Sequence, residues 1–479
     1  MSIWRGIEFI GRGDKETLRF YDDLLGYVFK QIDGLKRLVA YVAEGDSELA
    51  SNEAAMIGSA RAYRQDSRQS HKKERRQKVT IPMKSNAQLG TELHQQLVRE
   101  LDQLKDRLAR VSTSVHKNPE LGLKEYKSAE LLCSELERDS FQVERKVAGM
   151  DTAFRATIRG KPGGPTIALL AEYDALPEIG HACGHNLIAT IALGAALALS
   201  KIMPQLKGNL VVLGTPDEEG TGGKVTMIEN GFFKDVDAAM IVHPSNKTQV
   251  IADILAISSL EIKFKGKAAH AAASPEKGIN ALDAVIQTFN GINALRQHVR
   301  SDVRIHGIIT DGGKRPNIVP ETAAAFFFVR AADRKYKDEV LKRIKRCAQG
   351  AAAATGAKLE LIVRPRALDD MKNNMTMAKT FEKYLAALGE KVQAPDPKAG
   401  KGSTDMGNVS YVVPSIHPSI AIGPKKLAGH SREFAVASVS EHGHEAMLIA
   451  AKAMALTSLD LFQDEALMQK VQNEFKKGK

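Results

Sequence analysis

Two acidic residues, two histidines and a cysteine lie close together between Glu172 and His185. Glu172 and Asp174 stand in the run Glu-Tyr-Asp-Ala-Leu-Pro, and Cys183 and His185 follow in His-Ala-Cys-Gly-His-Asn. Thiolate, imidazole and carboxylate groups together suit zinc or another divalent ion of similar softness. Taken alone, this segment would equally suit a buried cysteine beside the start of a helix.

A second motif contains the adjacent acids Glu218 and Glu219, within Gly-Thr-Pro-Asp-Glu-Glu-Gly-Thr-Gly-Gly. Neighbouring side chains on an extended loop point in different directions, so one glutamate can bind a metal ion while the other moves protons. The glycines are not followed by the Lys-Ser/Thr pair of a phosphate-binding loop, which argues against a phosphate site. Surface charge is the alternative for this motif alone.

Two further histidines follow apolar segments later in the chain. His243 stands in Val-His-Pro, and His430 stands in Ala-Gly-His-Ser. Singly, each of these histidines has an ordinary structural interpretation, and Cys183 alone would permit an enzyme with a thiol nucleophile. Together, the four motifs supply sulfur, nitrogen and oxygen ligands and favour a dinuclear metal hydrolase.

The elements that must position these residues alternate between strand and helix from about residue 91 onward. Such alternation predicts β-α-β units on a largely parallel sheet, in which functional residues gather at the carboxyl ends of the strands. The expected strands and helices, in chain order, are a helix near 93–114, a strand at 166–171, a helix at 187–202, a strand at 209–214, a helix at 224–233 and a strand at 238–243. The motifs follow these strands.

Residues 251–366 read as a separate module in the order strand, helix, strand, strand, helix, strand, which resembles a ferredoxin-like α+β sandwich. The fold class is therefore α/β: a main domain with a mixed, largely parallel sheet, interrupted by a smaller α+β domain. The expected divisions are an appendage, two halves of a catalytic domain and a lid between them, at residues 1–90, 91–250, 251–366 and 367–479. The appendage reads as helical segments followed by a basic linker, with no assigned role.

The 479 residues are 43% hydrophobic, as expected for a folded globular protein of several domains. The net charge of +11 invites a nucleic-acid or membrane interpretation. The densest basic cluster, residues 61–78, is not interleaved with the aromatic side chains that single-strand binders use for stacking. We therefore expect no nucleic-acid binding, with a basic adaptor at residues 55–80 as an alternative.

The three cysteines cannot form a disulfide framework, and their odd number suits a reducing compartment. The longest apolar run, residues 187–200, is too short to cross a bilayer, so no membrane span is expected. The expected location is cytoplasmic.

The ordered motifs resemble the aminoacylase/carboxypeptidase family of co-catalytic metallopeptidases, peptidase family M20, over residues 91–465. Within that family the chain is similar to the amidohydrolase branch, which includes Xaa-Arg and β-alanyl dipeptidases, aminobenzoyl-glutamate hydrolase and indole-acetyl-amino-acid hydrolases. The resemblance implies a zinc-peptidase-like main domain and an inserted lid through which two subunits dimerise.

The resemblance also implies two divalent metal ions per subunit, zinc or manganese. The implied metal ligands are Cys183, His185, Glu219, His243 and His430. Glu218 matches the general base, and Asp174 matches the acid that orients a ligand. This branch often has aspartate at the position where this chain has Asn186. We do not interpret the asparagine as a sign of inactivation, because it resembles the sequence of the dipeptidase-like group.

Lid and loop positions match as well. His270, in Ala-Ala-His-Ala-Ala-Ala-Ser-Pro, resembles the histidine that reaches the partner subunit and polarises the scissile carbonyl. Asn317 and Arg330 match residues that grip the substrate's carboxylate. Gly402 and Ser403 resemble a substrate-contacting loop of the main domain.

The predicted function is metal-assisted hydrolysis of the amide bond in N-acyl amino acids or short dipeptides with a free carboxylate, with Glu218 as the general base. One alternative is an inactive family member that serves as a binding or scaffold protein. The other is a basic N-terminal adaptor for nucleic acid or membranes.

Overall fold

The computed structural model describes residues 90–363, 367–395 and 402–478. The basic cluster at 61–78, and all of the predicted appendage except residue 90, lie outside the described residues. Among the described residues, no helix is both long and apolar enough to cross a membrane.

The main sheet has six strands in the order β1-β2-β4-β3-β5-β11. Their bounds are Gln142–Arg145 for β1, Phe154–Arg159 for β2, Lys161–Ala171 for β3, Lys207–Gly214 for β4, Ala238–Met240 for β5 and Ser415–Ile416 for β11. Strands β4, β3, β5 and β11 are parallel to their neighbours in this run, whereas β1 and β2 join antiparallel at the other edge. The expectation of a mixed α/β fold is confirmed.

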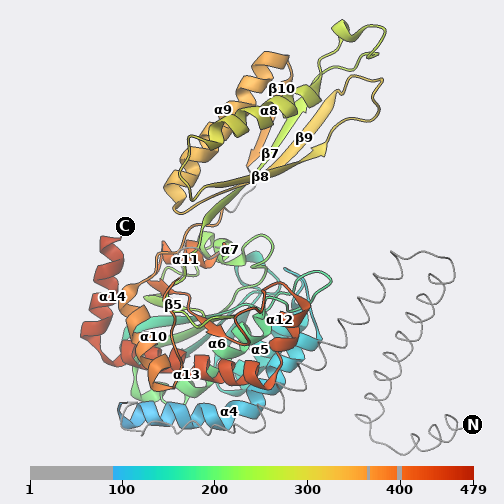
Figure 1. The fold of residues 1–479 in the computed structure, drawn as a ribbon. Helices are drawn as coiled ribbons and strands as arrows, with labels where there is room; N and C mark the ends of the chain where they lie inside the picture. The colour runs from blue at the N-terminus through green and yellow to red at the C-terminus, as the bar shows by residue number, and fades with distance from the viewer. Residues whose placement is uncertain (1–89, 364–366, 396–401, 479) are drawn as a thin grey trace, which may run out of the picture. The chain divides into compact units, whose positions relative to one another are not determined.

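Helices cover both faces of this sheet (Figure 1). One face carries α4 (Glu92–Lys117), α5 (Tyr126–Arg138), α6 (His185–Ser200), α10 (Met375–Ala387), α13 (Glu441–Gln463) and α14 (Glu465–Lys477), and the other carries α7 (Gly223–Glu229) and α11 (Met406–Ser410). Alternate residues of β3 serve the two cores, because successive side chains of a strand point to opposite faces. Ile167 and Leu169 belong to the larger core, and Ala168 and Leu170 to the smaller one.

The predicted helix at 187–202 is α6, which is apolar on every side because it is buried throughout its length. It lies between β3, α4 and α13 in the larger core. Its first residue is His185, so the burial of this helix fixes the position of a candidate ligand.

The predicted strand at 238–243 is divided in two. β5 ends at Met240 in the main sheet, and β6 (His243–Ser245) pairs instead with β12 (Ser419–Ala421) in a separate two-stranded sheet. Pro244 has no N–H to give to a ladder, which suits a short edge pairing rather than continuation of the central strand. The break leaves His243 at the point where the chain turns out of the main sheet.

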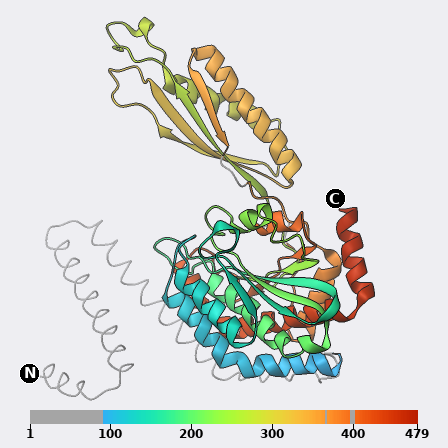
Figure 2. The ribbon, with the colours of Figure 1, turned by 180° about the vertical axis from the view of Figure 1, so that it is seen from behind.

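A second sheet is formed within residues 256–363. Its elements are β7 (Ala256–Lys265), α8 (Ala281–Arg296), β8 (Arg304–Asp311), β9 (Thr322–Ala331), α9 (Arg334–Thr355) and β10 (Lys358–Val363). The strands lie in the order β10-β7-β9-β8, with every neighbouring pair antiparallel. Helices α8 and α9 bury one face of this sheet in a core of its own, and Figure 2 shows α9 lying along it.

Candidate active site

Three parallel strands of the main sheet lead into the predicted site. Glu172 follows β3 directly, Glu218 lies in the loop after β4, and His243 lies just beyond β5. The carboxyl ends of parallel strands share one edge of a sheet, so these side chains meet there. At Gly184 the backbone has φ +80°, and a Cβ atom would lie 2.5 Å from Cγ of Pro244. Glycine is therefore needed for this turn to pack against the segment that carries His243.

The five predicted metal ligands converge. Sγ of Cys183 lies 3.4 Å from Nε2 of His243, and Nε2 of His430 lies 3.1 Å from Oε1 of Glu219. Ligand atoms of Cys183, His185 and His243 all lie within 4.8 Å of one another, as do those of Cys183, Glu219 and His430. Two overlapping groups of three donors thus share the cysteine sulfur.

The chemistry of this donor set fits a divalent cation. Nε2 of His185 and Oε2 of Glu172 are buried, make no hydrogen bond, and lie 3.6 Å apart. Burial raises the pKa of the Cys183 thiol, so its thiolate form needs a cation at the sulfur. Sulfur, imidazole and carboxylate donors are those that zinc and similar ions prefer.

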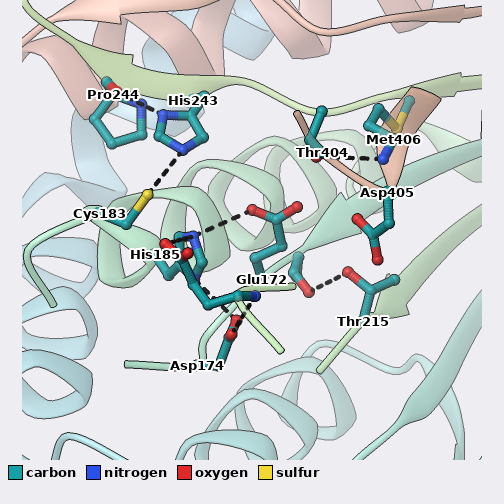
Figure 3. Close-up of polar contacts among 12 residues, drawn as sticks. Glu172, Asp174, Cys183, His185, Thr215, His243, Pro244, Thr404, Asp405 and Met406 are labelled. Carbon is teal, nitrogen blue, oxygen red and sulfur yellow. Dashed lines mark hydrogen bonds and ion pairs between the residues drawn. The ribbon is translucent and has the colours of Figure 1, made fainter. Parts of the chain in front are cut away.

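Hydrogen bonds at Nδ1 orient the imidazoles of His185 and His243 (Figure 3). Nδ1 of His185 donates to Oδ1 of Asp174 over 2.9 Å, and Nδ1 of His243 donates to the carbonyl of Pro244 over 2.6 Å. These bonds leave Nε2 of each ring facing the donor cluster. Asp174 also accepts the backbone N–H of Glu219 at Oδ2 over 3.0 Å, so it orients two candidate ligands.

The pKa values of the two adjacent glutamates are shifted in opposite directions. Burial raises the pKa of Glu218 well above its ordinary value, and the nearby carboxylates of Glu172 and Asp405 raise it further. Burial would also raise the pKa of Glu219, but the hydrogen bond from His430 and the charge of His185 bring it below the ordinary value. Glu218 is therefore the better proton acceptor and Glu219 the better anionic ligand.

A buried lysine that was not singled out from the sequence lies beneath the cluster. Nζ of Lys224 donates to Glu172 and, over 2.7 Å, to Asp405, and all three side chains are fully buried. Burial would raise the pKa of Glu172, yet the Lys224 charge brings it below its ordinary value. Lys224 follows a glycine pair at the start of α7, and only the fold reveals its two acidic partners.

A cavity of about 610 Å³ opens beside the cluster. Its wall includes the predicted base Glu218 and the predicted metal ligand His243. It also includes Arg330, Gly402 and Ser403, which were predicted to bind substrate. Arg330 donates from Nη1 to Oγ of Ser403 over 3.1 Å, while its Nε is buried and makes no hydrogen bond.

The cavity wall also contains His417, which sequence reasoning missed. Its ring stands edge-on to the His243 ring, with centroids 5.7 Å apart, and burial lowers its pKa to about 3. The run Ile-His-Pro carries no spacing that distinguishes it from a structural histidine.

His270 and Asn317 are brought to each other but not to this cavity within the described chain. The backbone N–H of Ala271 donates to the carbonyl of Asn317, and Nδ1 of His270 accepts the N–H groups of Ala272 and Ala273. His270 is exposed, and the bonds at Nδ1 leave Nε2 to carry a proton and donate it. Neither His270 nor Asn317 is among the residues that line the cavity.

Asn186 points away from the cluster. Its Nδ2 donates to Oγ of Ser112 over 2.9 Å and to the carbonyl of Ser438 over 3.1 Å. The asparagine therefore ties α6 to neighbouring helices, and its replacement of an aspartate removes no donor from the site.

Known proteins match this chain over most of its length. Residues 168–453 match the sequence model of peptidase family M20/M25/M40. The chain is 35% identical over 403 residues to the Xaa-Arg dipeptidase of Mus musculus, a match that covers 80% of this chain and 92% of that enzyme. It is 31% identical to one of the polypeptides of the p-aminobenzoyl-glutamate hydrolase of Escherichia coli, over 77% of this chain and 92% of that polypeptide.

Solved structures show the same fold. A dinuclear metal-binding peptidase of the M20 family from Bacillus subtilis superimposes with a TM-score of 0.61 at 21% identity, covering 76% of this chain and 99% of that one. The aminobenzoyl-glutamate utilization protein of Klebsiella pneumoniae gives a TM-score of 0.61 at 22% identity, over 77% and 99%.

Proposed function

The chain belongs to peptidase family M20/M25/M40 and is a metal-dependent hydrolase of amide bonds, and we propose that it cleaves dipeptides or N-acyl amino acids that end in a free carboxylate. The observation that carries this proposal is the placement of Arg330 in the cavity beside the donor cluster. A guanidinium with an unpartnered, buried Nε is suited to bind a carboxylate at the end of the substrate away from the scissile bond.

We propose that Cys183, His185, Glu219, His243 and His430 hold two divalent ions, zinc or manganese. When bound, such ions lower the pKa of the attacking water and polarise the amide carbonyl. Asp174 keeps Nε2 of His185 turned toward the ions, and Lys224 balances the charge of the carboxylates below them.

Glu218 acts as general base in this proposal. It takes a proton from the attacking water as the water oxygen bonds to the carbonyl carbon, and it returns that proton to the amide nitrogen as the C–N bond breaks. The products are a carboxylic acid and an amine. A base with a raised pKa is suited to both halves of this transfer, since it holds the proton between the two steps.

His270 would stabilise the oxyanion from a second subunit. Its Nε2 is available as a donor, and it lies outside the cavity lining of its own chain. Dimerisation through residues 251–366 is supported by β8, an edge strand on which Ile308 is 64% exposed and Ile309 46%. The strand order β10-β7-β9-β8 supports a ferredoxin-like lid. Asn317, whose carbonyl accepts the N–H of Ala271 next to His270, would face the substrate together with that histidine.

A basic carboxyl-terminal residue is the first substrate to examine. Xaa-Arg dipeptidases of Mus musculus and Homo sapiens are 35% and 34% identical to this chain. Asp253 lines the cavity that Arg330 lines, and its carboxylate suits a cationic side chain. We also propose a cytoplasmic location, which the free thiols of Cys133, Cys183 and Cys347 support.

The test is a panel of β-alanyl-lysine, an Xaa-Arg dipeptide, p-aminobenzoyl-glutamate and the C-terminal amide of each, assayed with zinc and with manganese. We expect release of the amino acid from at least one free acid and at least tenfold slower cleavage of its amide, as loss of a charged hydrogen bond implies. Equal cleavage of acids and amides would contradict the proposed carboxylate recognition.

A further inference from the structure

The loop that carries Glu218 and Glu219 is held in an unfavourable backbone conformation. Asp217, the residue before Glu218, has φ +62°. This is the left-handed region of backbone conformation, which residues other than glycine rarely adopt. Its carboxylate accepts the backbone N–H of Thr221 over 2.8 Å, which closes the loop on itself. A Cβ atom at Gly122 would lie 1.8 Å from Oδ1 of Asp217, so the loop also packs tightly against the segment before α5.

A fully buried carboxyl group, on the residue that precedes α5, holds this loop. Oε1 of Glu125 accepts the backbone N–H of Asp217 over 2.9 Å, and Oε2 accepts the hydroxyl of Thr152 over 2.7 Å. On the other side of Glu218, Asp174 accepts the backbone N–H of Glu219. The residues immediately before and after Glu218 are therefore each fixed by a buried carboxyl group.

The two carboxyl groups are connected to each other. The carbonyl of Thr152 accepts the hydroxyl of Tyr173 over 2.6 Å, and Tyr173 directly precedes Asp174. Two hydrogen bonds therefore link Glu125 through Thr152 to Tyr173, and the peptide chain links Tyr173 to Asp174, which orients His185. Displacement of the Glu125 carboxyl group would therefore shift the backbone next to Glu218, the proposed base.

Glu125 has no other evident task in the part of the chain that the structure describes. It is the residue before α5, yet its side chain makes no capping hydrogen bond to that helix, and none of the described ion pairs involves it. Glu120 serves the start of α5 instead, by accepting the backbone N–H groups of Lys127 and Ser128.

We propose that Glu125 is a positioning residue that fixes the backbone ahead of Glu218, so that the Glu218 carboxylate meets the attacking water in productive geometry. This inference rests on the proposed role of Glu218 as general base. Reacting groups need placement to within a fraction of an ångström, and a displacement of about 1 Å can cost on the order of a hundredfold in rate.

Side-chain length tests this inference in the full-length, metal-loaded enzyme. Glu125→Asp keeps the charge and improves the helix cap but withdraws the carboxylate from Asp217 by about one methylene. Glu125→Gln removes the charge but keeps the reach, because its carbonyl can accept from Asp217 and its amide can donate to Thr152. Glu120→Asp is the matched control, since it perturbs the start of the same helix without touching the loop.

We expect Glu125→Asp to lower kcat at least tenfold, with KM within about threefold and two metal ions still bound. Glu125→Gln and Glu120→Asp should keep kcat within about threefold of wild type. Amide hydrogen exchange over residues 215–220 should accelerate in Glu125→Asp alone. A structural role through charge or capping would reverse the order of the Asp and Gln variants.

A folded Glu125→Asp with wild-type kcat would overturn the inference, as would an equal loss in Glu120→Asp. Should Glu125→Asp not fold, Thr152→Val removes the hydroxyl that fixes Oε2, and an unchanged kcat in that variant would overturn it too. Failure of the proposed role of Glu218 can be distinguished from failure of this inference. If Glu218 is not the general base, Glu218→Gln stays active. If only this inference fails, Glu218→Gln is inactive and Glu125→Asp is active.

Discussion

Cys183 and His243 approach each other to 3.4 Å between Sγ and Nε2, although one precedes a helix and the other follows a strand sixty residues later. The contact depends on the left-handed turn at Gly184, which packs against Pro244. Two motifs that are separate in the sequence thus become one donor cluster.

Chelation should abolish turnover. Dialysis against a strong chelator removes the ions that the cluster is proposed to hold. Zinc or manganese should restore activity and raise the melting temperature progressively as the free metal concentration increases. Enzyme assays and thermal unfolding before and after metal addition measure both effects. Full activity after complete removal of metal would instead support the thiol-nucleophile alternative at Cys183.

Asp174→Asn should weaken metal binding or activity about 10- to 100-fold, because the neutral amide no longer favours Nδ1–H of His185 and binds the Glu219 backbone less strongly. Metal titration followed by calorimetry gives the affinity. Asp237→Asn is the control, since Asp237 also accepts a backbone N–H, from Thr166, but has no contact with the cluster. Equal losses in both variants would show that a general structural effect is responsible.

Arg330→Met should raise KM for substrates with a free carboxylate and leave the slow cleavage of their C-terminal amides unchanged. Loss of a charged hydrogen bond corresponds to about 10- to 100-fold in kcat/KM. Arg334→Met is the matched control, because Arg334 lies four residues later and pairs with Asp369. If acid and amide substrates lose activity in parallel, Arg330 does not recognise the carboxylate.

Glu125 should make the fold less stable as the pH rises. Burial raises its pKa from 4.5 to about 7, so the folded state binds a proton that the unfolded state releases between these values. The free energy of unfolding therefore falls across this window, by up to about 3 kcal/mol from this group, and is constant above it. Glu125→Gln lacks this dependence.

Urea unfolding of both metal-free proteins between pH 4 and 8 measures the difference, which should grow in favour of Glu125→Gln from about pH 4.5 to 7. A difference that does not change with pH would mean that Glu125 does not titrate in this range.

The alternation of strand and helix in the main domain could be predicted from the sequence because buried parallel strands and the apolar α6 are continuous hydrophobic runs. The strands β1 and β2 were not predicted. β1 is short and largely exposed, with the sequence Gln-Val-Glu-Arg, so it carries little hydrophobic signal. The family and its amide hydrolysis were also predicted correctly, since the motifs are compact and ordered.

The supporting residues could not be predicted in the same way. Lys224 bonds to Asp405, and Glu125 bonds to the backbone of Asp217. Both partners are distant in the sequence, so only the fold shows what these two side chains do. His417 likewise becomes notable only because the chain places it on the cavity wall beside His243. Short motifs identify donors, but the groups that hold those donors in place lie outside the motifs.

The most direct test of Glu218 as the general base is Glu218→Gln, assayed on the best substrate of the panel with metal content measured on the same sample. We expect two bound ions per chain, a KM close to wild type and a kcat lower by about a hundredfold or more, since general-base catalysis contributes about 10²–10⁴ in rate. A Glu218→Gln enzyme with both ions bound and near-wild-type kcat would contradict that role.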